Sequence, residues 1–378
     1  MPSVSFKKLA IVSTQAFSLI NFRGDLISFL VRRGVQVFAL APDYDESTER
    51  AIRGLGGVPV VFCIDRVAIN PLSALKVMWD LGRIFRSLQV DAVLSYFAKP
   101  VIYAGIAARV VRVPRIYSMI EGAGYVFSDD SLRTLRKKFL RLIVGRLYWL
   151  SLRYSHRVFL LNQDDYKLFV HGGLVQADKV KLLPGIGVDL QRYCAVRPLV
   201  NPITFVFMGR LLKEKGICDF IEAARKVRLK YNSQVRFVVV GDVDLNPGSI
   251  RRDAVIGWER EGLIQWVGHV NDVRHWLARA SVFVLPSFYR EGLPRSIQEA
   301  MATGLPIITT NWVGCRETIE DGRNGFLVPI RDPVSLANAM ERFILEPVII
   351  FKMGLESRLL AESRFNVHKI NRQIVASM

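Results

Sequence analysis

The sequence predicts an α/β protein built from two doubly wound domains. The chain has 378 residues, more than one ordinary hydrophobic core needs, and this length fits two domains of roughly 100–200 residues. Hydrophobic residues make up 51% of it, enough to fill two buried sheets. Short apolar runs alternate with helical patterns twice along the chain, which is typical of parallel sheets covered by helices.

The first half of the chain holds seven candidate strands. A polar loop over 14–21 follows the first of them, and a helix over 23–33 follows the loop. Ligands of such sheets bind at the carboxyl ends of the strands, so the loops over 14–21 and 121–125 are candidate parts of a cleft. The expected strands cover residues 8–13, 35–41, 58–62, 92–96, 115–120, 157–161 and 180–183.

A Pro- and Gly-containing stretch over 187–202 predicts a linker, with residues 1–186 before it as the first domain. The second domain is expected over 203–347, again with helices between its strands. Those strands are expected over 203–208, 235–240, 263–267, 281–285 and 306–309.

The most informative segment sets two carboxylates, Glu291 and Glu299, eight residues apart across the start of a helix. A strand runs directly into it, and Pro294 is a helix start signal. The free N–H groups and positive dipole of the first helical turn, beside Gly292 and Leu293, form a seat for an anion. This layout suits a nucleotide sugar, with the ribose at Glu299 and the sugar at Glu291. The alternative is an amphipathic helix with solvated glutamates.

The E-x7-E pattern resembles the retaining glycosyltransferases of family 4. Gly-Leu-Pro follows the first Glu, Glu-Ala-Met-Ala surrounds the second, and Gly-Leu-Pro-Ile-Ile-Thr-Thr follows. The resemblance implies the GT-B fold, in which two Rossmann-like domains face each other across a cleft. It assigns the acceptor to 1–186 and the nucleotide sugar to 203–347, and it implies that the helices over 348–378 return to the first domain.

Basic residues follow the first strand of the second domain. Arg210 and Lys215 suit a diphosphate, Arg as a planar fork and Lys as a point charge, and the matching residues hold it in the family. They would stabilise the departing nucleoside diphosphate. Asp242 and Val270 end later strands and resemble the family's contacts to the base. The alternatives are a solvated basic loop and, for Asp242, a structural role.

Asp242 also begins an Asp-x-Asp triplet, a pattern that binds a divalent metal in another glycosyltransferase fold. Three-residue matches arise easily by chance, and this one lies far in sequence from the E-x7-E helix. We therefore expect no essential metal and no cofactor.

The formal charge of +18 implies a polyanionic partner. Residues 131–154 carry seven Arg or Lys and no acidic residue, with Leu, Phe, Tyr and Trp between them at helical spacing. Such a helix can lie in the headgroup plane of an anionic membrane. We expect peripheral docking at the cytoplasmic face of the inner membrane; the alternative is a core-facing helix with a solvated basic face. The expected docking residues are Arg133, Arg136, Lys137, Lys138 and Arg141.

The acceptor side resembles a narrower branch that builds capsule and O-antigen glycans on polyprenyl diphosphate. The motifs are Asn-Phe-Arg23, Lys99-Pro and Glu121-Gly122-Ala-Gly124, where many family members have His in place of Glu121. Arg23, Lys99 and also Arg115 are candidates for the acceptor's diphosphate. Each of these three cations has a structural role as its alternative.

These expectations combine into a hexosyl- or N-acetylhexosaminyltransferase that uses a UDP-sugar, with an N-acetylhexosamine as the suggested sugar and a polyprenyl-diphosphate-linked saccharide as acceptor. The resemblance implies retention, with the leaving phosphate taking the acceptor's proton. One alternative is a soluble transferase with a water-soluble acceptor. Nucleic acid is not expected because no recognition motif accompanies the charge. A dinucleotide oxidoreductase is disfavoured because neither domain start carries G-x-G-x-x-G.

Four widely spaced cysteines read as reduced thiols. No signal peptide is visible, and no apolar run is long enough to span a bilayer.

Overall fold

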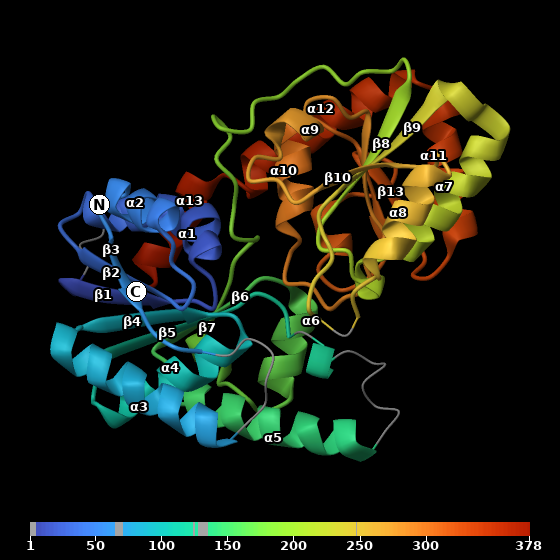
Figure 1. Cartoon of the computed structure of the whole chain (residues 1–378). Coiled ribbons are helices and arrows are strands. Elements are labelled where there is room, and N and C mark those ends of the chain that lie inside the picture. Colours follow the sequence, from blue (N-terminus) through green and yellow to red (C-terminus); the bar gives the residue numbers. More distant parts are fainter. Residues whose placement is uncertain (1–4, 65–70, 124, 128–134, 247) are drawn as a thin grey trace. The chain divides into compact units, whose positions relative to one another are not determined.

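The computed structural model describes residues 5–64, 71–123, 125–127, 135–246 and 248–378 (Figure 1). The chain divides into two compact units. The first comprises Met1–Ile186 with Val367–Met378, and the second comprises Gly187–Asn366.

The first unit has a seven-stranded parallel sheet in the order β3-β2-β1-β4-β5-β6-β7. Helices α1, α2 and α13 pack together on one face, and α3, α4 and α5 on the other (Figure 1). The strands are β1 (Lys8–Val12), β2 (Gln36–Ala41), β3 (Val58–Val61), β4 (Ala92–Tyr96), β5 (Arg115–Ile120), β6 (Arg157–Leu160) and β7 (Val180–Leu182). The helices are α1 (Ala16–Val31), α2 (Glu46–Gly54), α3 (Pro71–Leu88), α4 (Ala98–Val110), α5 (Leu135–Leu152), α6 (Gln163–Tyr166), continued by a π-helical turn (Lys167–His171), and α13 (Val367–Ala376).

The second unit has a six-stranded parallel sheet in the order β10-β9-β8-β11-β12-β13. Helices α7 and α11 pack together, and so do α10 and α12. The strands are β8 (Ile203–Met208), β9 (Val235–Val240), β10 (Gln265–Gly268), β11 (Val282–Leu285), β12 (Ile307–Thr310) and β13 (Gly325–Val328). The helices are α7 (Ile217–Tyr231), α8 (Arg252–Arg260), α9 (Arg274–Leu277), α10 (Arg295–Thr303), α11 (Pro333–Leu345) and α12 (Val348–Arg364).

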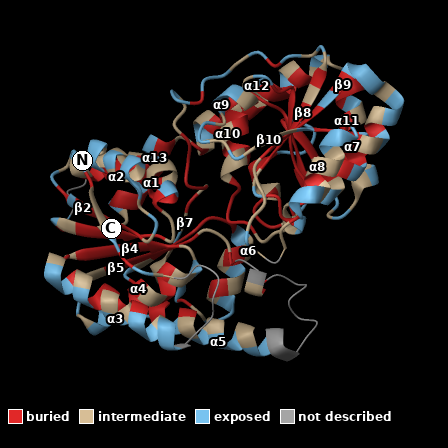
Figure 2. Cartoon of the chain, in the orientation of Figure 1, coloured by how far each residue is buried: buried red, intermediate tan, exposed pale blue. Residues whose placement is uncertain are grey.

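The central strands are buried along almost their whole length, since helices cover both faces of each sheet (Figure 2). Every residue of β4 and of β11 is buried. Continuous burial explains why these strands read as unbroken apolar runs instead of alternating patterns. Each of the twelve expected strands is present, and two doubly wound units confirm the expected α/β class.

The loop expected over 14–21 is mostly helix, because α1 begins at Ala16. The Ala16 N–H donates to Oδ1 of Asp43, 2.7 Å away and beyond the next strand. A carboxylate at this position satisfies a free N–H of the first turn. The expected helix start at 23 was therefore wrong, since the cap comes from a residue distant in sequence.

The C-terminal segment divides between the units. Helix α12 lies in the second unit, where it packs on α10, and only Val367–Met378 belongs to the first unit, where α13 packs on α1. The expectation that all of 348–378 joins the first domain is thus corrected for α12. In the described parts of the chain, every helix is too short or too polar to span a bilayer.

Candidate functional site

The site in the second unit is built where its strand order reverses. Strand β8 is hydrogen-bonded to β9 on one side and to β11 on the other. The loop with Arg210 and Lys215 follows β8, and the segment with Glu291 follows β11. The carboxyl ends of adjacent parallel strands meet at one edge, and a reversal of strand order leaves a crevice there for ligands.

Lys215 and Glu291 form an ion pair at this reversal, through Nζ and Oε1. Their side chains remain 15% and 11% exposed, so the pair is sheltered but reachable. The Ser287 hydroxyl donates to the same Glu291 oxygen at 3.2 Å. Nζ of Lys215 also lies 5.6 Å from the ring centroid of Tyr289. The structure therefore brings together two of the three residues expected to carry catalysis.

Main-chain contacts hold the two loops in register. The Glu214 carbonyl accepts from the N–H groups of Phe288 at 2.8 Å and Tyr289 at 2.9 Å. Gly216 is the N-cap of α7, with φ +79°, and a Cβ there would lie 2.0 Å from the Pro286 carbonyl oxygen. Glycine is thus required for this close approach, which fixes Lys215 beside the end of β11.

Gly292, Leu293 and Pro294 lead into α10, and Pro294 is its N-cap. The loop after β12 packs against them: a Cβ on Gly314 would meet the Gly292 carbonyl oxygen at 2.5 Å. Helix α10 thus begins four residues after Glu291, close to the start that the sequence predicts. Its positive end suits an anion.

Glu299, on α10, is held by two partners. The Tyr193 hydroxyl donates to its Oε1 at 2.9 Å, and Nε of Arg295 donates to the same oxygen at 2.9 Å. Burial, and then the neighbouring Glu299 carboxylate, raise the pKa of Tyr193 well above its usual value. The phenol therefore stays protonated and acts as a donor to Glu299.

Arg210 points to a different partner from Lys215. Its Nη1 lies 3.2 Å from Oδ2 of Asp244, and its side chain is 45% exposed. Asp242 pairs with Arg252 at 2.7 Å. Both carboxylates of the Asp-x-Asp triplet are therefore in ion pairs with arginines. Within the described ranges, no group of three or more His, Cys, Asp or Glu side chains could hold a metal ion.

Val270 follows β10, two residues after Gly268, which has φ +75°. Both residues are half-buried. The N–H of Gly241, which directly follows β9, donates to the Gly268 carbonyl oxygen at 2.8 Å. The loops expected to contact the base thus end neighbouring strands β9 and β10.

Cys315 is buried, and its thiol is close enough to Glu291 to interact with that carboxylate. Burial, followed by the Glu291 carboxylate, raises the pKa of its thiol to about 12. The thiol is therefore neutral at physiological pH and unreactive as a nucleophile.

The acceptor-side candidates of the first unit lie partly in its interior. Arg23, 2% exposed, forms an ion pair with Glu121 through Nη2 and Oε1. Its guanidinium also stands 4.4 Å over the Tyr96 ring and contacts the Met119 sulfur at 2.9 Å. Gly122 follows with φ +102°, and Gly124 lies outside the described residues.

Lys99 lies in the first turn of α4 and is half-buried. The N-cap before that helix, Phe97, has φ +69°, which is unusual for a residue with a side chain. It joins the carboxyl end of β4 to α4, so Lys99 stands at the same edge of the sheet as Glu121.

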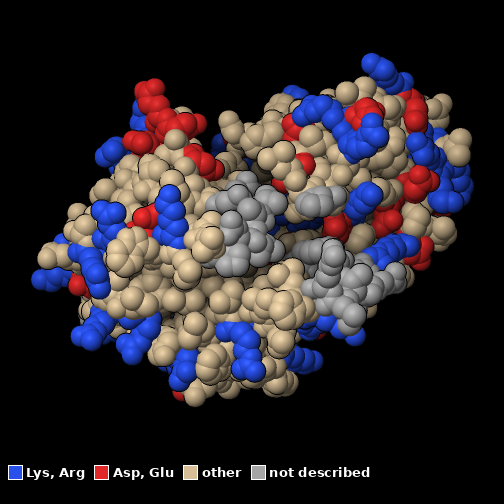
Figure 3. Space-filling model, turned by 60° about the horizontal axis from the view of Figure 1, so that its bottom comes forward, with Lys and Arg blue, Asp and Glu red and all other residues tan. Residues whose placement is uncertain are grey.

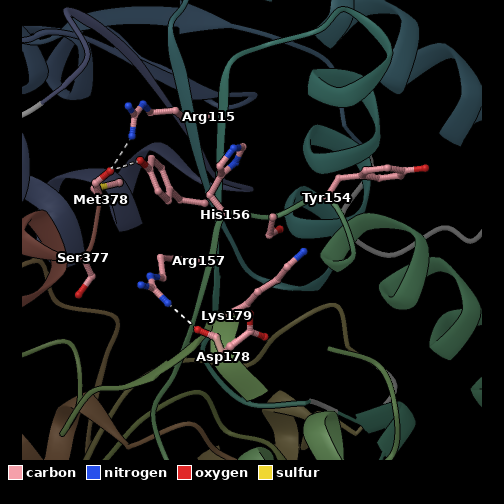
Figure 4. A pocket seen from close by; sticks show the side chains of 10 residues that line it. Arg115, Tyr154, His156, Arg157, Asp178, Lys179, Ser377 and Met378 are labelled. Carbon is pink, nitrogen blue, oxygen red and sulfur yellow. Dashed lines mark hydrogen bonds between the residues drawn. The ribbon is translucent and has the colours of Figure 1, made fainter. Parts of the chain in front are cut away.

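Arg115 stands at the opposite edge, because it begins β5 while Glu121 follows that strand. A six-residue strand spans about 20 Å, so the two residues serve different surfaces. Arg115 lines a hollow of about 690 Å³ with His156, Arg157 and Lys179 (Figure 4). It donates there to the Met378 carbonyl at 3.3 Å. Its position away from Lys99 and Glu121, and its bond to the chain's last residue, favour the structural role that the sequence left open for it.

The basic stretch forms α5, which packs on α4. Arg133 lies outside the described residues, and Arg136 and Lys137 fall in the first turn of the helix. Lys138 is exposed and Arg141 half-buried, with the Arg141 guanidinium 5.4 Å from the Phe127 ring. Phe139 and Leu142 are 65% and 60% exposed, so large apolar side chains stand beside the cations.

Sequence reasoning assigned no role to Tyr193, Arg295 or Ser287. Tyr193 lies 106 residues before Glu299, and no local pattern could reveal that contact. Arg295 and Glu299 are four residues apart on a helix, which is a recognisable signal for an ion pair.

Part of the second unit matches a known domain family, and most of the chain is similar to known enzymes. Residues 202–346 match the family described as glycosyl transferases group 1. A Campylobacter jejuni relative, N,N'-diacetylbacillosaminyl-diphospho-undecaprenol alpha-1,3-N-acetylgalactosaminyltransferase, is 26% identical, over 87% of this chain and 87% of its own. An Escherichia coli relative, UDP-Gal:alpha-D-GlcNAc-diphosphoundecaprenol alpha-1,3-galactosyltransferase, is 26% identical, over 80% of this chain and 78% of its own.

Solved structures share the fold. Anabaena HepE in complex with UDP has a TM-score of 0.75 at 20% identity, covering 97% of this chain and 98% of its own. The sucrose-phosphate synthase of Thermosynechococcus elongatus has a TM-score of 0.77 at 16% identity, covering 97% of each chain. Residues 202–346 therefore form a group 1 glycosyltransferase domain, and the chain is a glycosyltransferase with the GT-B fold.

Proposed function

We propose that this chain is a retaining, family 4 enzyme that moves a sugar from a UDP-sugar to a saccharide carried on polyprenyl diphosphate. An N-acetylhexosamine is the first sugar to test. The observation that carries the proposal is the Lys215–Glu291 pair at the reversal of strand order, directly before α10. The named activities of the Campylobacter and Escherichia relatives, both on diphospho-undecaprenol-linked sugars, support the acceptor class.

In this proposal the donor's diphosphate lies between Lys215, Arg210 and the first turn of α10. Lys215 turns from Glu291 to the phosphate and stabilises the charge that develops as the nucleotide leaves. Arg210, half exposed beside Asp244, can exchange that surface partner for phosphate oxygens, because exposed ion pairs contribute little. Gly292 and Leu293 provide main-chain contacts beside the phosphates.

Glu291 orients the sugar hydroxyls and Glu299 the ribose hydroxyls. Tyr193 and Arg295 hold Glu299 in place, so its carboxylate is positioned before the donor binds. Asp242 and Val270 lie beside the base. The leaving phosphate takes the proton of the acceptor hydroxyl as the new glycosidic bond forms on the same face of the sugar.

On the acceptor side, Lys99, Gly122 and Gly124 are proposed to contact the diphosphate and saccharide. Arg23 and Glu121 are proposed to act indirectly: their buried ion pair fixes the start of the loop that carries Gly122 and Gly124. Lys138 and Arg141, with Arg133, Arg136 and Lys137, hold the enzyme at the anionic cytoplasmic face of the inner membrane.

The test is transfer of radiolabelled sugar from UDP-N-acetylhexosamines to a polyprenyl-diphosphate-linked saccharide, with EDTA present. Stabilisation by UDP in thermal unfolding checks the donor separately: about 100 Kd of ligand adds ~2.7 kcal/mol. Stabilisation by GDP and not by UDP would overturn the donor assignment. Equal transfer to the free saccharide, with no flotation on anionic vesicles, would instead favour a soluble enzyme with a water-soluble acceptor.

A further inference from the structure

A groove of about 660 Å³ runs along α5 in the first unit. Its apolar lining comes from Phe127, from side chains of α5, and from the π-helical segment and the turn after it. These side chains are Leu142, Trp149, Leu168 and Leu174. Phe127, Leu168 and Leu174 also belong to, or pack on, the core cluster beneath, so the floor of the groove is the unit's own core.

Glycines keep this groove open. Gly145 faces it from α5, and a Cβ there would meet only Leu174, at 3.9 Å. Gly172 and Gly173 form the opposite wall. A Cβ on Gly172 would stand 2.2 Å from the Leu168 carbonyl oxygen, and Gly173 has φ +69°, so neither position accepts a side chain without strain.

The polar rim of the groove carries one sign of charge. Of the described residues that line it, Lys138, Arg141 and Arg146 are basic and none is acidic. Lys and Arg also predominate over Asp and Glu across the helical face of the first unit that comes forward in Figure 3. An apolar trough with a cationic rim complements an amphiphile that has one apolar chain and an anionic head.

We propose that this groove takes one acyl chain of an anionic phospholipid from the bilayer, with its phosphate held by Lys138, Arg141 and Arg146. A methylene is similar in size to a water molecule, which occupies about 30 Å³, so the groove holds roughly twenty carbon groups. That capacity matches one acyl chain and is small for a polyprenyl chain. The inference rests on the proposed membrane docking and extends it, because α5 then holds a lipid instead of only resting on headgroups.

Trp149 provides the readout, since it lines the groove. The full-length protein is mixed with phosphatidylglycerol vesicles whose acyl chains carry bromine, which quenches nearby tryptophan. The Trp149 signal is the difference between the wild type and Trp149→Phe. We expect strong quenching of this signal, and at least a fivefold smaller effect with neutral phosphatidylcholine.

The decisive variant is Gly145→Leu, which fills the groove and keeps all three cations. Leu is a better helix former than Gly, so the helix is retained. The variant should still float with the vesicles but lose most of its Trp149 quenching. Gly257→Leu, at a helical glycine of the second unit with open space around it, is the matched control and should behave as the wild type.

Wild-type quenching in Gly145→Leu would overturn the groove while leaving membrane docking intact. Quenching that appears only when a brominated polyprenyl phosphate is added would assign the groove to the acceptor's chain and overturn the phospholipid. Absence of both flotation and quenching would overturn docking and groove together. None of these readouts needs donor or acceptor, so a failure of sugar transfer is detected separately.

Discussion

The two units reverse their strand order in the same way but place different chemistry at the reversal. In the second unit, Lys215 and Glu291 meet between β8 and β11 and remain 15% and 11% exposed. In the first unit, the place between β1 and β4 is filled by Ser13, Ser18 and Tyr96, all fully or almost fully buried. Ser18 is 2.6 Å from the Ser13 hydroxyl and 2.9 Å from that of Tyr96.

The two units therefore share a reversal of strand order but differ in the side chains that lie at it. The fold supplies a ligand edge in both units. At the reversal of the second unit an ion pair stays partly exposed, whereas the described groups between β1 and β4 of the first unit are buried hydroxyls. The first unit has a charge pair too, Arg23–Glu121, yet it is closed into the interior. The buried polar groups of the first unit stabilise its sheet. The Lys215–Glu291 pair of the second unit is partly exposed, so it can exchange partners with a ligand.

The largest expected effect is a loss of stability when the buried Arg23–Glu121 pair loses its cation. Arg23→Met leaves Glu121, 9% exposed, without its cation, and removal of one partner of a buried pair costs about 3–5 kcal/mol. Urea unfolding should show this loss in the first unit, and the double variant Arg23→Met/Glu121→Leu should recover much of it. Unchanged stability with abolished transfer would instead make Arg23 a contact to the acceptor.

Substitution of Lys215, in the partly exposed Lys215–Glu291 pair, should lower the rate of sugar transfer. In the proposed mechanism Lys215 stabilises the leaving phosphate. By analogy with other charge-stabilising donors, we therefore expect Lys215→Ala to lower kcat about 10²–10³-fold. Steady-state transfer assays measure this. Lys213→Ala, at an exposed position in the same loop, is the control and should stay near the wild-type rate. An equal loss in both variants would mean that general charge, not the pair, supports the reaction.

The dependence of stability on alkaline pH tests the burial of the Cys315 thiol near Glu291. The ordinary pKa of a Cys thiol is 9.0, and burial raises that of Cys315 to about 12. A pKa raised in the folded state contributes stability that is present below pH 9 and is lost as pH rises from 9 toward 12. The unfolding free energy of the wild type should therefore fall more steeply in that window than that of Cys315→Ala, by at most ~1.4 kcal/mol per pH unit. Parallel curves would contradict the burial of the thiol.

The smallest effect concerns donor positioning. Tyr193→Phe removes one hydrogen bond to Glu299, worth about 1 kcal/mol, so affinity for the UDP-sugar should fall about fivefold with kcat little changed. Calorimetric titration measures the affinity. Tyr231→Phe, at the far end of α7, serves as the control. A large fall in kcat with unchanged affinity would place Tyr193 nearer the reaction than we infer.

The sequence predicts well what depends on local pattern. Apolar runs located every described strand except β13, and the spacing of Glu291 and Glu299 predicted that they lie on either side of the α10 start. Strand β13 was missed because its four residues begin with Gly325, where a Cβ would stand 1.8 Å from the Ile307 carbonyl oxygen. Gly325 allows β13 to approach β12 closely, but a glycine also makes the segment look less like a strand in the sequence.

Contacts between distant segments could not be predicted. The Asp43 cap on α1, the Tyr193 bond to Glu299 and the closure of Arg23 onto Glu121 each join residues separated by an intervening element or more. Arg23 illustrates the physical limit best. A lone arginine in a sequence reads equally as a phosphate ligand or a structural cation, and only its 2% exposure separates the two.

The division of the C-terminal helices bears on how the chain is made. Residues 187–366 form the second unit and interrupt the first, whose final helix, α13, lies beyond them. A ribosome adding 5–20 residues per second needs roughly 10–40 s to make that interruption. During this interval the second unit can fold as a contiguous piece, while α1 still lacks α13, the helix that packs on it. The first unit therefore matures last, although its synthesis begins first.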